Sequence, residues 1–320
     1  MSRTSTLQST LGSSPATHTR PHGLTIAAAT AVVSGVAVFI NGFGVRAWQG
    51  VADATTYTTL KNIVAASIIV GVALTVQRGS EAPRVPVGLK SRIGLFAVAV
   101  VGGSVPFVLF FEGLAAVSSS QAGIIHKTLI VWVAVLATVV LRERIGWPHL
   151  AAIALLVGGQ AVLGGGNGPL AFGRGEWLLL AATLLWSIEV VVAKRLLVEA
   201  PPIMLGVARM AGGAALLVVY SSFRGWAIDL AALSLAHVVW ILATGAVLSL
   251  YVMGWYTALA RARAVDVTAV LVGGAVVTAV LDVGLRGIPA PPVLGLGLVT
   301  AGVVLAFFAS MLRPSIASSP

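Results

Sequence analysis

Long apolar stretches, separated by short connectors that carry charges, glycines or prolines, run through the chain from Leu24 to Leu312. A helix that crosses a bilayer needs about 20 mostly apolar residues. Ten segments meet this length: Leu24–Val45, Thr55–Val76, Ile93–Leu114, Gln121–Leu141, Trp147–Gly165, Trp177–Val198, Pro202–Phe223, Leu235–Leu259, Val265–Leu285 and Val293–Leu312. The apolar runs are continuous, whereas the strands of a membrane β-barrel alternate in short segments. The pattern predicts an all-α multi-pass membrane protein with ten transmembrane helices.

The stretch 107–145 has a fainter counterpart 145 positions later in the chain. Leu114-Ala115 matches Leu259-Ala260, Val131 matches Val276, and Ala134-Val135-Leu136 matches Ala279-Val280-Leu281. The constant offset divides the chain into two repeats of five helices, residues 24–165 and 177–312. Because five is odd, the second repeat must be inverted relative to the first, an arrangement common in secondary transporters. Residues 1–22 and 313–320 are predicted to be cytoplasmic tails, the first of them disordered.

Composition supports a membrane protein and sets its orientation. Of the 320 residues, 58% are hydrophobic and only 9% charged, where a soluble domain has about 25% charged residues. The net charge of +10 would suggest nucleic acid for a soluble protein. Here, with the N-terminus inside, 13 loop Lys and Arg residues lie inside and four outside, so the positive-inside rule predicts that both termini are cytoplasmic. The abundant Ala, Gly, Val and Arg suggest a bacterial plasma membrane.

Several ionisable side chains fall inside the predicted helices, where a charge costs about 2.5–3.5 kcal/mol on insertion scales. Helix directions sort them by depth into an outer cluster of Lys61, Glu112, His126 and Lys127 and an inner cluster of Glu189 and Arg209. Our hypothesis pairs Glu112 with Lys61 or Lys127, and Glu189 with Arg209. A spare positive charge in the outer cluster would then hold a substrate carboxylate.

Other polar and aromatic residues have both functional and structural interpretations. Trp186 lies three residues before Glu189, on the same helix face, and completes the predicted substrate-binding set. His126 could relay protons or serve as a hydrogen-bonded packing residue. Asp282 stands four residues before Arg286, which a local helix pair explains, and Asp266 could cap its helix.

The chain contains no cysteine, no GxSxG or HExxH sequence and no Walker A run, so the sequence predicts no catalytic residue, cofactor or metal site. Expected partners are the lipid bilayer and a small-molecule substrate, without nucleic acid, and a homodimer stays open. Two alternatives to a transporter are an intramembrane lipid-modifying enzyme and a non-transporting membrane assembly factor. The enzyme would need a base with a partner, and His126 has no obvious Asp or Cys companion.

Ten helices in two repeats, together with Leu141-Arg142-Glu143-Arg144 at the end of the fourth helix, resemble the EamA-type members of the drug/metabolite transporter superfamily. Lys61 and Arg209 lie where such proteins often have a basic residue. The second repeat departs from this pattern, because Leu285-Arg286-Gly287-Ile288 lacks the acidic residue. The resemblance implies a carrier, often an exporter, of small organic metabolites such as amino acids.

Overall fold

The computed structural model describes residues 16–79, 88–117, 122, 125–163, 173–226, 228–287 and 289–311. Within these residues the regular elements are helical, and a single isolated bridge pairs Ala52 with Ile228. The elements are α1 (Ala16–Ala47), α2 (Ala54–Gly79), α3 (Leu89–Val101), α4 (Val105–Ala116), α6 (Leu129–Val140), α7 (Trp147–Leu163), α8 (Arg174–Leu196), α9 (Pro202–Val207), η1 (Ala208–Gly212), α10 (Gly213–Arg224), η2 (Leu230–Ala232), α11 (Leu235–Arg261), α12 (Ala264–Leu271), α13 (Gly274–Arg286) and α14 (Val293–Met311).

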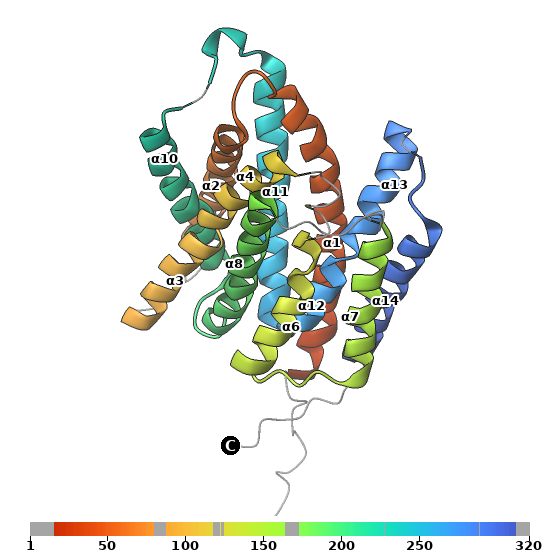
Figure 1. Ribbon diagram of the computed structural model, residues 1–320. Helices are drawn as coiled ribbons and strands as arrows, with labels where there is room; N and C mark the ends of the chain where they lie inside the picture. The colour runs from red at the N-terminus through yellow and green to blue at the C-terminus, as the bar shows by residue number, and fades with distance from the viewer. Residues whose placement is uncertain are drawn as a thin grey trace, which may run out of the picture.

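The predicted all-α multi-pass membrane fold is confirmed. Eight helical spans in the described residues are long and apolar enough to cross a bilayer, and two shorter apolar helices, Ile125–Val140 and Trp147–Leu163, complete the ten. Helix α1 begins and α14 ends at the lower face in Figure 1, which we call the terminal face. Successive spans alternate in direction between this face and the opposite one.

Three predicted helices are less regular than expected, and two of them divide at glycines. The third divides into α3 and α4 around Gly102 and Gly103, ahead of Pro106. Pro106 lies in the first turn of α4, where its missing N–H leaves no hydrogen bond unmade. The ninth divides into α12 and α13 before Gly274, and the seventh contains the π-helical segment η1.

Helix ends also differ from the predicted ones. Helix α1 begins at Ala16, eight residues before the predicted Leu24, and the fourth helix is described only in part before Leu129. Residues 1–15 and 312–320, which contain most of the first predicted tail and all of the second, lie outside the described residues.

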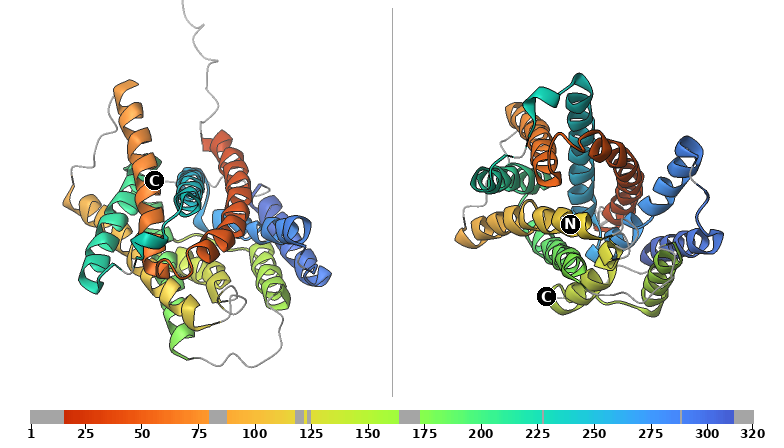
Figure 2. Two further views of the ribbon diagram at one scale, coloured as in Figure 1. Left: turned by 90° about the horizontal axis from the view of Figure 1, so that it is seen from above. Right: turned by 45° about the horizontal axis from the view of Figure 1, so that its top comes forward.

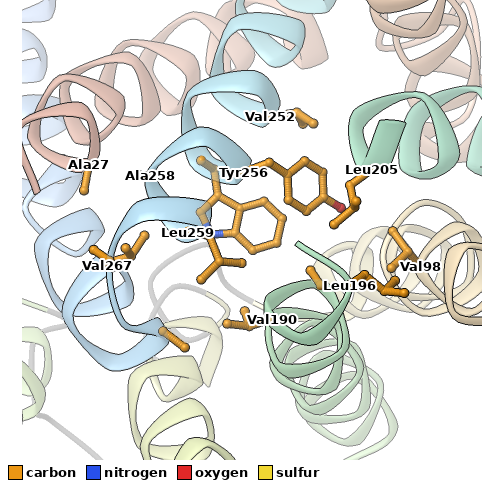
Figure 3. Close-up of a cluster of buried hydrophobic side chains, with 14 of the residues drawn as sticks. Ala27, Val98, Val190, Leu196, Leu205, Val252, Tyr256, Ala258, Leu259 and Val267 are labelled. Atoms are coloured by element: carbon orange, nitrogen blue, oxygen red, sulfur yellow. The ribbon is translucent and has the colours of Figure 1, made fainter. Parts of the chain in front are cut away.

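The main helix contacts join the first five spans to the last five. Helix α1 packs along α11, α3 and α4 pack against α8, and α7 packs against α14. Figure 2 shows α7 and α14 side by side at one edge of the molecule, with α3 and α10 toward another. The largest apolar core lies among α8, α9, α11 and α12, where Tyr256 and Leu259 contact residues from several helices (Figure 3).

Candidate substrate site

A buried ion pair lies at the centre of the bundle. The Nη1 atom of Arg209 donates to both carboxylate oxygens of Glu189, at 2.7 and 2.6 Å, and the Tyr256 hydroxyl donates to the same carboxylate at 2.7 Å. Glu189 is fully buried and Arg209 is 6% exposed. The Arg209 guanidinium also lies 5.0 Å from the ring centroid of Trp255. The predicted pairing of Glu189 with Arg209 is therefore confirmed.

The break between α3 and α4 makes room for this pair. A Cβ on Gly102 would overlap the Glu189 carboxylate, and a Cβ on Gly103 would overlap the Arg209 carbonyl oxygen. Glycine is the residue that permits such close approaches. Arg209 itself belongs to the π-helix η1, and π-helical turns occur frequently at functional sites.

An aromatic cluster connects this pair to the predicted outer residues. It consists of Phe107, Phe110, Phe111, His126 and Trp186. The Trp186 indole N–H donates to the Gly102 carbonyl at 3.2 Å, as expected for a side chain on the face of Glu189. The ring of His126 lies 5.1 Å from that of Trp186 and 5.4 Å from that of Phe110, measured between centroids. Trp186 thus contacts both the Glu189 side of the site, through Gly102, and His126 of the predicted outer cluster.

Lys61 reaches the same cluster from α2. Its Nζ atom lies 5.5 Å from the Phe111 ring centroid and 5.6 Å from that of Tyr57, and it donates to the Asn41 side-chain oxygen at 3.3 Å. The side chain is 5% exposed, and no carboxylate among the described residues pairs with it. Lys61 is therefore a buried ammonium held by one amide oxygen and two aromatic faces.

Lys127 and His126 lie at the start of the fourth span. Lys127 is partly buried and forms no hydrogen bond or ion pair with the described residues. The Nδ1 atom of His126 is buried without a hydrogen-bond partner, and its ring contacts are aromatic. No acid–base dyad is therefore present at His126 in the part of the chain that the structure describes.

The predicted pairing of Glu112 with Lys61 or Lys127 is wrong. Glu112 instead turns toward α10, where Arg224 Nη1 lies 2.7 Å and the Tyr220 hydroxyl 3.1 Å from its Oε1 atom. Arg224 is the last residue of α10, one residue beyond the predicted segment Pro202–Phe223. This pair borders a cavity of about 320 Å³ that Arg174 also lines. Within the described residues, Glu112 is therefore not the partner of either lysine.

Further polar groups of the site had not been predicted. The Thr58 hydroxyl and both polar atoms of the Asn62 amide are buried on α2 without a hydrogen-bond partner, as is Nε of Arg209. Buried polar atoms nearly always have partners, so each such atom calls for an explanation. The sequence signal was the run Thr58-Thr59-x-Lys61-Asn62, four polar residues in the outer half of an apolar helix.

The remaining predicted charges have local explanations. Asp282 pairs with Arg286 at 2.8 Å, as expected for positions four apart on a helix. Asp266 lies in the first turn of α12 and contacts Arg263 and His149. Among the described residues, no group of three or more His, Asp or Glu side chains could hold a metal ion.

A family model matches one part of the chain. Residues 22–165 match the model of the EamA-like transporter family. This EamA-like region ends just beyond α7, the fifth span of the described fold. The match agrees with the resemblance to the drug/metabolite transporter superfamily that the sequence pattern had indicated.

A solved structure supports the fold over nearly the whole chain. One crystal structure, whose title states no function, superposes with a TM-score of 0.73 over 92% of this chain and 100% of that one, at 15% sequence identity. No curated protein matches the sequence. The structural likeness covers far more of the chain than the region that the family model matches.

Proposed function

We propose that the protein is a secondary-active carrier that exports small organic metabolites bearing a carboxylate, such as amino acids, by alternating access. The observation that carries this proposal is that Lys61 and Lys127 lack a carboxylate partner among the described residues, while arginines already neutralise Glu112 and Glu189. An unpaired charge in a membrane interior is costly, and it persists where it serves a substrate or ion path. A solute carboxylate would offset that cost.

The surroundings of the lysines support an organic solute. Ring faces of Phe110, Phe111, His126 and Trp186 supply apolar contact area beside Lys61. The unpartnered Thr58 hydroxyl and Asn62 amide supply donors and acceptors on the same helix. Binding sites for small molecules combine these features: mostly apolar walls with a few polar groups that fix orientation.

The proposal includes the orientation of the protein in the membrane. In the described residues, eight Lys and Arg side chains stand at helix ends of the terminal face, against four at the opposite face: Lys90, Arg92, Arg142, Arg144, Lys194, Arg195, Arg261 and Arg263, against Arg46, Arg174, Arg224 and Arg286. The positive-inside rule then makes the terminal face cytoplasmic, in a cell membrane. The predicted inverted repeats, 24–165 and 177–312, agree with the exchange of partners between halves, in which α1 packs on α11 as α3 and α4 pack on α8.

Counterflow in proteoliposomes tests the substrate class. Proteoliposomes that contain the purified protein and are loaded with unlabelled amino acids or other small carboxylates should accumulate the same solute in radiolabelled form from outside. Lys127→Glu should abolish this accumulation. Lys61→Met should raise the half-saturating concentration about 10- to 100-fold, because a hydrogen bond to a charged group contributes about 1.5–3 kcal/mol.

Lys90→Gln is the matched control, because Lys90 is an exposed lysine in the first turn of α3, at the terminal face. It should transport like the wild type. Unchanged counterflow in both Lys61→Met and Lys127→Gln would remove the lysines from the site. Wild-type protein that exchanges none of the carboxylates would refute the substrate class.

A further inference from the structure

The end of α6 forms a contact that no step of substrate binding uses. The chain turns back after Leu141, where Arg142 has a φ of +55°, and the Glu143 N–H then donates to the Ala137 carbonyl at 3.0 Å. A positive φ is uncommon for a residue other than glycine, asparagine or aspartate. The turn directs the Glu143 side chain out of its own helix and toward the second half of the molecule.

The Glu143 carboxylate caps α12. Its two oxygens accept hydrogen bonds from the backbone N–H groups of Ala264, at 2.8 Å, and Val265, at 3.3 Å. These N–H groups open the helix and have no partner within it, and the partial positive charge of a helix N-terminus favours an anion. The preceding residue, Arg263, provides no side-chain cap. A residue 121 positions away therefore does what a local capping side chain usually does.

Neighbouring contacts tie the same two chain segments together. Arg263 Nη1 donates to the Arg144 carbonyl at 3.0 Å, while its Nε and Nη2 atoms bind Asp266 at 2.8 and 2.7 Å. Arg195 of α8 donates to the Val140 carbonyl at 2.7 Å, at the end of α6. We call the contact of Glu143 with the N-terminus of α12 the latch. It lies on the terminal face, between the two predicted repeats.

At the corresponding position of the second half, the sequence has no carboxylate. With the offset of 145 residues, Arg142 corresponds to Gly287, which also has a positive φ, of +63°. The turn is thus present in both halves. Glu143 corresponds in sequence to Ile288, an apolar residue that cannot accept a hydrogen bond through its side chain. The sequence therefore supplies the carboxylate of the latch in the first half only.

We infer that Glu143 is a gating residue: its carboxylate holds the terminal face closed by capping α12, and this contact must break for the carrier to open toward that side. The inference rests on the proposed transport by alternating access. Both repeats supply the turn but only one supplies the carboxylate, so the latch biases the carrier toward the conformation closed at the terminal face. Removing it shifts the population toward the other conformation.

Cysteine accessibility tests the latch without any substrate, because the chain has no native cysteine. Thr268→Cys places a thiol on α12 at a position only 4% exposed, and Ala134→Cys places one on α6 at 5% exposed. A membrane-impermeant maleimide, applied at the terminal face of oriented vesicles, should label both slowly in the latched protein. Adding Glu143→Ala should accelerate both about 5- to 30-fold, the factor expected from losing a helix cap.

Glu199→Ala is the matched control. This carboxylate also joins two segments at the terminal face, accepting from the Ser91 hydroxyl at 2.6 Å, but it does not contact α12. It should leave both labelling rates unchanged. Acceleration at position 268 alone would mean that α12 merely frays, and it would overturn the inference. Equal rates in Glu143→Ala and Glu199→Ala would overturn it as well.

A cross-link separates the latch from the proposed function. The double variant Glu143→Cys/Val265→Cys, once oxidised, should stop counterflow, and reduction should restore it, whereas Glu143→Cys alone should not respond to oxidant. Counterflow that continues in the cross-linked protein would refute the gating role. If the wild type transports no carboxylate, the proposed function fails, while the labelling rates still decide whether the latch closes this face.

Discussion

At the scale of single residues, the described interior pairs its acidic side chains Glu112 and Glu189 with arginines, while Lys61 and Lys127 have no carboxylate partner among the described residues. Glu189 and Arg209 form a fully buried pair that the Tyr256 hydroxyl also joins, linking α8, η1 and α11. A buried pair contributes little net stability, because removing two charges from water costs several kcal/mol for each ion. Removing only one partner is different, since the remaining charge then has no counter-ion.

Glu189→Gln is therefore expected to lower the free energy of unfolding by about 3–5 kcal/mol. The double variant Glu189→Met/Arg209→Met, which buries apolar groups of similar size, should be much closer to the wild type. Denaturant unfolding of purified protein in detergent measures both. The single variants Glu189→Met and Arg209→Met complete the comparison. If the double variant lowered the free energy of unfolding by the sum of the two single decreases, the two ions would not stabilise each other.

Sequence reasoning identified this pair but not the partner of Glu112. For Glu189 and Arg209, their opposite charges and similar predicted depths were enough to predict the pairing. For Glu112 the depth argument pointed to Lys61 and Lys127, yet Arg224 was the partner, because a long arginine at a helix end can reach back along its helix. Which helices face each other decides such pairs, and a single sequence does not contain that information.

At the scale of elements, the bilayer fixes the lengths of the spans, while tertiary contacts fix their interruptions. The starts of α7, α11 and α14 agree with the predicted residues, because about 20 apolar residues are needed wherever a helix crosses lipid. The break at Gly102 and Gly103 could not be predicted. It exists because the Arg209 carbonyl and Gly213 lie against the gap, more than 100 residues along the chain.

Gly103→Ala should destabilise the protein by about 1–3 kcal/mol, because its Cβ would meet backbone atoms of Arg209 and Gly213 that cannot rotate away. Gly71→Ala is the matched control in α2: a Cβ there has nothing within 4 Å, and it should stabilise the helix by about 0.5–1 kcal/mol. Thermal unfolding in detergent should move in opposite directions for the two variants. A shift of the same sign would contradict the close contact of α3 with η1.

At the scale of the whole molecule, the segment that the family model matches does not pack mainly against itself. The family model matches residues 22–165, the first five spans. Yet the main partners of those spans lie in the second half: α1 contacts α11, α4 contacts α8, and α7 contacts α14 (Figure 2). The repeat pattern in the sequence predicted two halves, but the exchange of partners between them follows only from their arrangement in space.

This exchange predicts that residues 1–172 alone cannot reach the native fold, although the family match covers almost all of their apolar spans. Alone, α1, α4 and α7 would lose their largest packing surfaces, so trypsin should degrade the fragment quickly. Co-expression with residues 173–320, preceded by a cleavable signal sequence that starts α8 on the outer side, should restore protection. The two halves should then co-purify through a tag on one of them. A protease-resistant, monodisperse first half without its partner would contradict the inter-half packing on which the site depends.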